Sequence, residues 1–263
     1  MAERGGRDPA RTLALLWRTG AAPARGPKPG LTVDRIVATA IAIADAEGLA
    51  ALSMRRVADR LGVGAMSLYT YVPGKADLVD LMQDTVYGQT PRPEPAPGDW
   101  RAALTRIAWD NWALVHTHPW MLQVPASRLV LGPGEIGKYE YELGAVEGIG
   151  LSDVELDTVL DVLLSLVRGA ARTSVERARD LQRTGMTEAQ WWQAHAPLLA
   201  ELIEPRRYPL AVRVGAAAGA AHDAASDPRH TLESGLRWLL DGVEALVRTR
   251  GGDAGAEPRA RPT

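Results

Sequence analysis

The sequence lacks cysteine and phenylalanine altogether, and lysine supplies only three of its 30 basic residues. The absence of cysteine excludes disulfide bonds, thiol nucleophiles and zinc sites built from thiolates, and it suits a reducing compartment. No run reaches the roughly 18 apolar residues that a membrane-spanning helix needs. The apolar stretch LALLW at 13–17 is also shorter than the core of a secretory signal, about seven residues. We therefore expect a cytoplasmic protein without a membrane segment.

The overall charge is close to neutral, with a formal net charge of −2 at pH 7. This excludes a uniformly basic nucleic-acid-binding protein, so any contact with nucleic acid requires a local basic patch. Hydrophobic residues make up 46% of the 263 residues, which is enough for a packed core in one large domain or two ordinary ones.

Apolar residues recur at helical spacing along most of the chain, and no alternating run is long enough for a strand. Thr32 and Gly48 bound the first helical segment as an N-cap and a left-handed stop. Ser152 and Thr187 each open a capping box before a later segment. The span 204–227, rich in Pro, Gly and Ala, is expected to be partly a mobile loop. The prediction is an all-α chain with helices over 32–47, 53–61, 65–71, 75–87, 100–116, 138–146, 152–178, 191–203 and 231–247.

Proline divides the chain between residues 88 and 98, where GQTPRPEPAPG holds four prolines in eleven residues. Such a segment cannot continue a helix and indicates a stiff connector. It separates an N-terminal helical domain, 31–88, from a C-terminal helical domain, 99–250. Residues 1–30 carry six basic and two acidic side chains and are expected to form a flexible basic arm, and 251–263 a flexible tail.

The stretch VADRLGVGAMSLYTYVPGK, Val57–Lys75, has the spacing of a helix-turn-helix. Ala58 is small where two helices approach each other, Gly62 allows a sharp turn, and Leu68 and Val72 face the core. A helix of this kind presents its N-terminal residues to base edges in a major groove. The side chains left to face outward are Ala65, Met66, Ser67, Tyr69, Thr70 and Tyr71.

The same stretch is locally basic, since four basic residues stand against one acidic residue over 53–75, a net charge of +3. Arg55 lies on the same approach surface, and Lys75 begins the next helix, where free N–H groups favour an anion. The hydroxyls of Tyr69 and Tyr71 can donate to phosphate oxygens. A compact three-helix packing unit with an amphipathic surface is the open alternative.

The linked run LSMRRVADRLGVGAMSLYTYVPGKADLVD resembles the N-terminal domain of the TetR family of bacterial transcriptional regulators. The C-terminal LESGLRWLLDGVEAL is similar to the last helix of the tetracycline-repressor type, and the resemblance covers about residues 31–250. It implies a three-helix helix-turn-helix domain followed by a helical domain for ligand binding and dimerisation. It further implies a repressor that binds a palindromic operator in double-stranded DNA as a homodimer and is released by a small-molecule effector.

The resemblance also assigns DNA contacts by position. Arg55 is expected to read a guanine, because a guanidinium fits O6 and N7 together. Ala65 and Met66 replace the polar residues often found there, and contact with thymine methyl groups is the expected substitute. The assigned set is Met54, Arg55, Ala65, Met66 and Ser67 at base edges, Tyr69, Tyr71 and Lys75 on the DNA backbone, and Thr70 on the same outer face.

Tryptophan and histidine gather at helical spacing in the C-terminal half and suit a flat, apolar effector with a few polar handles. Trp109, Trp112 and His116 share one helix, and a second set lies at 191–195. Packing in the core is the alternative for any single tryptophan. The expected effector-binding residues are Trp109, Trp112, His116, Trp120, Arg128, Arg168, Arg172, Trp191, Trp192 and His195.

The resemblance does not extend to the magnesium–tetracycline site. Pro91, Ile107 and Pro125 pair with a histidine, an asparagine and the magnesium-holding histidine of the tetracycline repressor, and none of the three can replace its counterpart. The prediction is therefore no metal and no cofactor. Broad apolar faces over 152–178 and 231–247 are expected to form a four-helix interface between two protomers, with intramolecular packing as the alternative.

An enzyme is the first rival interpretation. The run at 132–137 matches the dinucleotide pattern G-x-G-x-x-G, but it lacks the preceding strand of a βαβ unit. His116 and His118 have no third ligand at helical spacing, and no nucleophilic serine motif is present. The sequence therefore predicts no catalytic residues. A helical interaction module without DNA binding is the second rival, and its expected mark would be a disrupted recognition helix.

Overall fold

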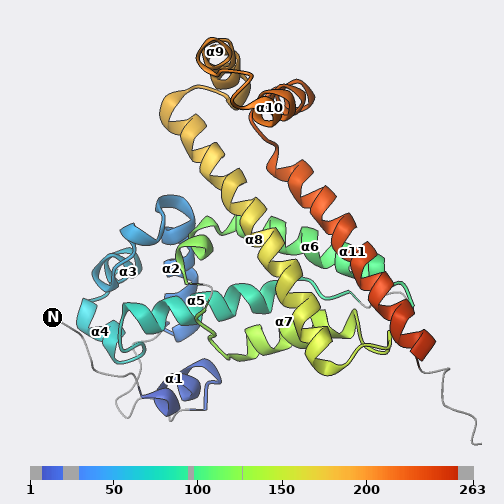
Figure 1. Ribbon diagram of the computed structural model, residues 1–263. Coiled ribbons are helices and arrows are strands. Elements are labelled where there is room, and N and C mark those ends of the chain that lie inside the picture. The colour runs from blue at the N-terminus through green and yellow to red at the C-terminus, as the bar shows by residue number, and fades with distance from the viewer. Residues whose placement is uncertain (1–7, 20–29, 94–97, 126, 254–263) are drawn as a thin grey trace, which may run out of the picture. The chain divides into compact units, whose positions relative to one another are not determined.

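The computed structural model describes residues 8–19, 30–93, 98–125 and 127–253, and within these ranges it contains helices and turns but no strand. Figure 1 shows the helices in chain order. The prediction of an all-α chain is confirmed for the described residues. The helices are α1 (Pro9–Leu16), α2 (Val33–Glu47), η1 (Leu49–Ala51), α3 (Met54–Leu61), α4 (Ala65–Tyr69), α5 (Lys75–Gln89), α6 (Trp100–Thr117), η2 (Pro119–Gln123), α7 (Pro133–Gly144), α8 (Asp153–Thr184), α9 (Glu188–Leu202), α10 (Pro209–His222) and α11 (Pro228–Asp253).

The chain divides into two compact units, the first ending at Asp157 and the second beginning at Thr158. This division lies well beyond the proline-rich connector that the sequence singles out at 88–98. The connector does not separate compact units because α5, before it, and α7, after it, pack extensively against each other.

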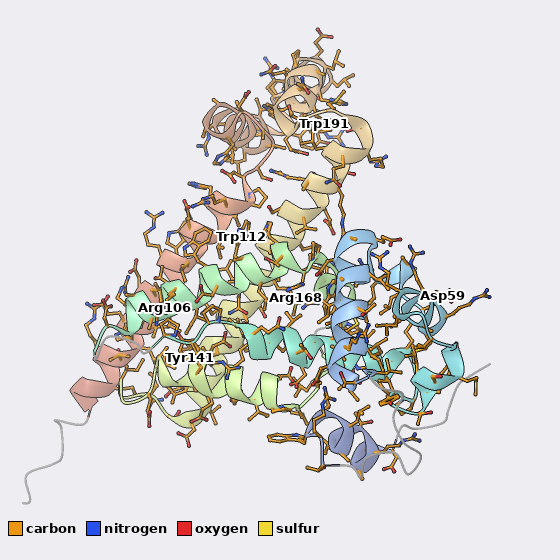
Figure 2. All side chains as sticks on the ribbon, turned by 180° about the vertical axis from the view of Figure 1, so that it is seen from behind. Asp59, Arg106, Trp112, Tyr141, Arg168 and Trp191 are labelled. Carbon is orange, nitrogen blue, oxygen red and sulfur yellow. The ribbon has the colours of Figure 1, made fainter. Side chains whose placement is uncertain are left out.

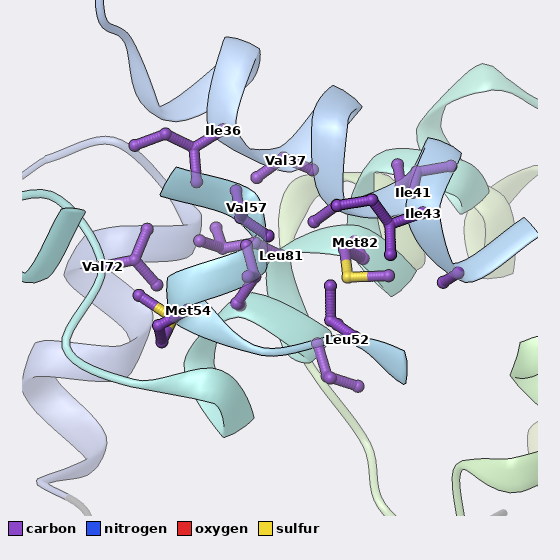
Figure 3. Close-up of a cluster of buried hydrophobic side chains, with 14 of the residues drawn as sticks. Ile36, Val37, Ile41, Ile43, Leu52, Met54, Val57, Val72, Leu81 and Met82 are labelled. Atoms are coloured by element: carbon purple, nitrogen blue, oxygen red, sulfur yellow. The ribbon is translucent and has the colours of Figure 1, made fainter. Parts of the chain in front are cut away.

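The core of the first unit is built by α2, α3, α4 and α5 (Figure 3). The apolar stripe of α2 is fully buried at Ile36 and Ala40, and α5 adds Leu78 and Met82, all at 0% exposure. Thr32 caps α2 by accepting from the Arg35 N–H at 3.1 Å, and Gly48 ends it at φ 82°. Burial of this stripe supplies most of the stability that short helices lack in isolation.

Residues 9–16 form helix α1, so the expectation of a flexible arm is wrong over this part of 1–30. Asp8 caps the helix by accepting from the Ala10 N–H, and Pro9 occupies its first turn. Leu16 is buried in the core, and the Trp17 indole N–H donates to the Leu131 carbonyl at 3.0 Å. The remaining positions of the expected arm, 1–7 and 20–29, lie outside the described residues, as do 254–263 of the expected tail.

Helix α7 approaches α5 unusually closely at Gly134. A Cβ on Gly134 would lie 1.9 Å from the Asp84 carbonyl oxygen, so only glycine fits there. The Asp84 carboxylate accepts from the Glu135 N–H at 2.9 Å, and the Glu135 carboxylate accepts from the Val130 and Leu131 N–H groups. The glycines of the G-x-G-x-x-G run thus belong to a helix junction, and α7 begins at Pro133, five residues before the expected start.

In the second unit, α8 and α11 bury one stripe each, and a Cβ on Gly235 would lie 2.9 Å from Leu166, which shows how closely they meet. The Arg177 guanidinium donates to the Ser226 carbonyl and hydroxyl oxygens at 2.8 and 2.6 Å, which fixes the turn before α11.

Residues 209–222 form α10, where the sequence indicates a partly mobile loop. The capping box of Thr187 and Gln190 before α9 is confirmed.

Candidate nucleic-acid interface and aromatic clusters

Helices α3 and α4 are joined by the tight turn that the sequence predicts. Gly62 ends α3 in the left-handed region, at φ 69° and ψ 32°, and its N–H bonds back to the last turn of α3. Ala58, Leu68 and Val72 are each 0% exposed, so both helices pack against the core on the expected side. The Ser53 hydroxyl starts α3 by accepting from the Arg56 N–H at 3.2 Å. The result is a helix-turn-helix with one buried and one outer face.

The outer face carries most of the side chains that the sequence assigns to DNA. Met66 is 79% exposed and Tyr69 44%, and the Arg55 side chain is 88% exposed. Thr70 and Lys75 are also exposed, whereas Ala65, Ser67 and Tyr71 are half-buried.

Two of the basic side chains on this face have partners within the chain. The Arg55 guanidinium lies 3.9 Å from the carboxylate of Asp59, which stands on the outer side of α3 (Figure 2). Such an exposed pair contributes little, so Arg55 can exchange it for another anion. The Lys75 ammonium donates to the Leu49 carbonyl at 3.1 Å.

Met54 does not belong to this face, and its assignment as a DNA contact is corrected. Its side chain is 5% exposed and lies in the core beside Val57 (Figure 3). The first turn of α3 points Met54 inward because it shares the helix face of Val57 and Ala58, three and four residues on. That i, i+3, i+4 pattern is visible in the sequence and is the signal that identifies Met54 as a core residue.

The first unit contains one of the two expected aromatic clusters, on α6. The rings of Trp109 and Trp112 meet edge to face, with 5.9 Å between centroids, and those of Trp112 and His116 lie 4.4 Å apart. His116 Nδ1 lies 2.8 Å from the Trp112 carbonyl oxygen. Trp109 and Trp112 are half-buried and His116 is exposed, so this cluster can offer ring faces to a flat molecule.

Two residues expected to bind the effector have structural partners instead. Trp120 is 0% exposed in the core, and its indole N–H donates to the Asp45 carboxylate at 2.8 Å. The Arg128 guanidinium pairs with the buried carboxylate of Asp80 and also donates to the Ala76 carbonyl. Both pairings join residues about 50 or more positions apart, and for that reason the local sequence pattern does not reveal them.

The second unit contains the other aromatic cluster, on α9. The rings of Trp191 and His195 are stacked, with centroids 4.1 Å apart. Trp192, the next residue, packs against α10, where a Cβ on Gly219 would lie 2.6 Å from its ring. Trp191 and Trp192 therefore do not share one wall.

An apolar cleft of about 220 Å³ lies between α9 and α10, and Trp192 is one of its lining residues, with Leu199, Ile203 and Val212.

The two arginines expected to meet an acidic effector stand one turn apart on α8 in the same unit. Arg168 is half-buried, and Arg172 is exposed with its guanidinium 3.9 Å from the Glu176 carboxylate.

A charged cluster lies between α6 and α7, and it was not predicted from the sequence. The Glu142 carboxylate, on a side chain 4% exposed, accepts from the Lys138 ammonium at 2.5 Å and from the Asn111 amide at 2.7 Å. Arg106 donates to the Tyr141 hydroxyl at 3.2 Å, and both residues are labelled in Figure 2. Burial raises the pKa of the neighbouring Asp110 above its ordinary value of 3.8, although Arg106 opposes the shift. The i, i+4 spacing of Lys138 and Glu142 was the available signal.

Among the described residues, no three His, Asp or Glu side chains are grouped closely enough to hold a metal ion. None of the helices in 8–19, 30–93, 98–125 and 127–253 has both the length and the hydropathy to cross a bilayer.

An all-helical chain whose helix-turn-helix keeps an exposed outer face has the architecture of helix-turn-helix regulatory proteins. The comparisons with known proteins agree. Residues 36–82 match the family model described as bacterial regulatory proteins, tetR family, and residues 92–247 match the tetracyclin repressor-like C-terminal domain. The chain belongs to the TetR family of transcriptional regulators. The first match ends before the connector at 88–98, and the second begins within it, at residue 92.

Individual relatives match over nearly the whole length. The chain is 46% identical over 253 residues to the HTH-type transcriptional repressor DrrR1 of Streptomyces coeruleorubidus, covering 95% of this chain and 91% of that protein. It is similar to ActR of Streptomyces coelicolor in complex with actinorhodin, with a TM-score of 0.69 and 29% identity over 83% of this chain and 97% of ActR. The ActR complex with (S)-DNPA gives a TM-score of 0.66 at the same identity, over 84% of this chain and 99% of ActR.

Proposed function

We propose that the protein is a repressor that binds a palindromic operator in cytoplasmic DNA as a homodimer and leaves it when a small aromatic effector binds. The observation that carries this proposal is the outer face of α3 and α4, where Arg55, Met66 and Tyr69 are exposed beside residues that form the core. Side chains without a packing role at such a face are available to DNA. The proposed contacts are Arg55, Ala65, Met66, Ser67, Tyr69, Thr70, Tyr71 and Lys75.

The relatives support the two halves of this function separately. DrrR1, which is called a repressor, matches the chain through both domains. ActR, whose solved structures include complexes with actinorhodin and with (S)-DNPA, supports binding of a small molecule, which we assign to the C-terminal domain. A regulator of this kind works through binding alone, so we propose no catalytic role for its residues.

The exposed ring faces on α6, in the first unit, and on α9, in the second unit, are two separate candidate contacts for an aromatic effector, each considered within its own unit. The Trp112 ring is tilted by 34° against that of His116, the Trp191 ring is stacked on that of His195, and each pair keeps an accessible side. Trp120 and Arg128 are not among the proposed effector contacts, because Trp120 donates to the Asp45 carboxylate and Arg128 pairs with the Asp80 carboxylate.

The homodimer is proposed to form through 152–178 and 231–247. Trp238 on α11 is 70% exposed and Val162 on α8 is 46% exposed, although both lie on helices whose other faces are buried. Large apolar side chains exposed at such positions mark an interface between chains. Two copies would set two recognition helices at a fixed spacing, which DNA binding by this motif requires.

Selection of DNA from a random pool with the purified full-length protein tests the proposal. We expect enrichment of a palindrome whose half-sites lie about one helical turn, ~10 base pairs, apart. Recovery of no common sequence would contradict the repressor and favour a helical interaction module. An enriched palindrome then supplies the probe for effector screening, in which an effector is recognised by release of the DNA.

A further inference from the structure

Met66 is the most exposed large hydrophobic side chain among the described residues of the first unit, at 79%. Its neighbours on α4 are less exposed. Ala65 is half-buried and packs on the core, Ser67 is half-buried, and Leu68 is 0% exposed. The start of the recognition helix therefore offers one long side chain to the outside, and that side chain is apolar.

The sequence of α4, AMSLY, contains none of the side chains that read bases through paired hydrogen bonds. Arginine and lysine pair with guanine in this way, and asparagine and glutamine pair with adenine. The apolar feature of a base pair in the major groove is the C5-methyl group of thymine. An unbranched thioether adapts its three rotatable bonds to such a small convex target.

We propose that Met66 determines sequence specificity by packing on the C5-methyl group of one thymine in each operator half-site. This inference rests on the proposed operator binding and adds the chemistry by which one position is read. Met66 takes this role instead of Ala65, because Ala65 is half-buried against the core whereas Met66 is 79% exposed. Recognition at the Met66 position depends on the methyl group itself and not on the hydrogen-bonding pattern of the base.

Replacing thymine by deoxyuridine tests the proposal, because it removes one methyl group and keeps every hydrogen-bonding atom. In the enriched operator, each thymine pair related by the palindrome is replaced in turn, and dissociation constants are measured by fluorescence anisotropy. For the wild type we expect one thymine position at which affinity falls about threefold to fivefold per half-site, the effect of losing one buried methyl-sized group.

The Met66→Ala variant should bind more weakly and lose the sensitivity to deoxyuridine at that position. Met186→Ala is the matched control, because Met186 is also exposed, at 45%, but lies before α9 in the second unit. Since neither side chain supports the core, both variants should keep the helical circular dichroism and melting temperature of the wild type. Met66→Leu, which keeps an apolar side chain, should keep the sensitivity as well.

A second substitution separates the methyl group from the base that carries it. With 5-methylcytosine at the sensitive position, wild-type affinity should exceed that with cytosine by the same factor, and Met66→Ala should not distinguish the two. The inference is overturned if no thymine position responds in the wild type, or if Met66→Ala responds equally. Both results presuppose selective binding, so they differ from failure of the proposed function, in which no operator is enriched.

Discussion

Gly134 shows at the scale of one residue how a missing side chain sets a helix junction. The Asp84 carbonyl oxygen occupies the space that a Cβ would take, and both atoms belong to backbones that cannot move aside easily. Gly134→Ala should therefore lower the free energy of unfolding by about 3 kcal/mol, the upper range for overpacking. Urea denaturation measures this loss.

Gly144 on the same helix is the matched control, because nothing lies within 4 Å of a Cβ added there. Gly144→Ala should leave stability unchanged or raise it by about 0.5 kcal/mol through helix propensity. Equal losses for the two variants would contradict the close-approach explanation for Gly134.

Single residues also show which parts of the candidate sites could be predicted from the sequence. Arg55, Met66 and Tyr69 are exposed as expected, because helical periodicity alone decides which side of α3 and α4 faces the core. The partners of Trp120 and Arg128, Asp45 and Asp80, could not be predicted, because they are distant in sequence and only the fold brings them together. Residue type indicates what a side chain can bind, and tertiary pairing decides whether it is available.

At the scale of elements, the carboxylate of Asp84 links α5 to the start of α7. Burial raises its pKa above the ordinary value of 3.8, although backbone N–H groups of Glu135 and Gly134 oppose the shift. A raised pKa means that the folded state binds the proton more tightly than the unfolded state. The ionised carboxylate consequently lowers stability at neutral pH, and this cost disappears as the pH falls through the raised pKa.

Asp84→Asn should remove that pH dependence, because the amide oxygen keeps an acceptor for the Glu135 N–H and carries no charge. We expect the variant to be at least as stable as the wild type at pH 7, with the difference shrinking as the pH falls toward 4. Thermal melts at both pH values measure it. A variant that is less stable at pH 7 and equally stable at pH 4 would reverse the sign and contradict the interpretation.

Elements with a regular apolar stripe were predictable, and elements without one were not. α2 and α11 follow the 3–4 spacing of their buried residues. α10 was missed because its Ala- and Gly-rich sequence buries only Gly219 and shows no stripe. α1 was missed because it is eight residues long, although Asp8 followed by Pro9 was a usable start signal.

At the scale of the whole molecule, the proposed function requires two copies held at a fixed distance. Trp238 is the proposed centre of the contact, since tryptophan is enriched among the few interface residues whose truncation costs about 2 kcal/mol or more. Trp238→Ala should weaken the dimer roughly thirtyfold, by that free energy. Sedimentation at several concentrations measures the change, and Leu129→Ala, 69% exposed in the first unit, is the control. An unchanged dimer constant for Trp238→Ala would place the interface elsewhere.

The central claim, that the outer face of α3 and α4 reads DNA, is tested most directly through Arg55. Binding to the enriched operator and to a scrambled duplex is measured at two salt concentrations for the wild type, Arg55→Ala and Arg183→Ala, whose Arg183 is also exposed but lies on α8. We expect selective, salt-sensitive binding by the wild type and by Arg183→Ala, and a loss of tenfold or more in Arg55→Ala, about 1.4 kcal/mol, with reduced selectivity. Undiminished selective binding by Arg55→Ala, or equal losses in both variants, would contradict the account.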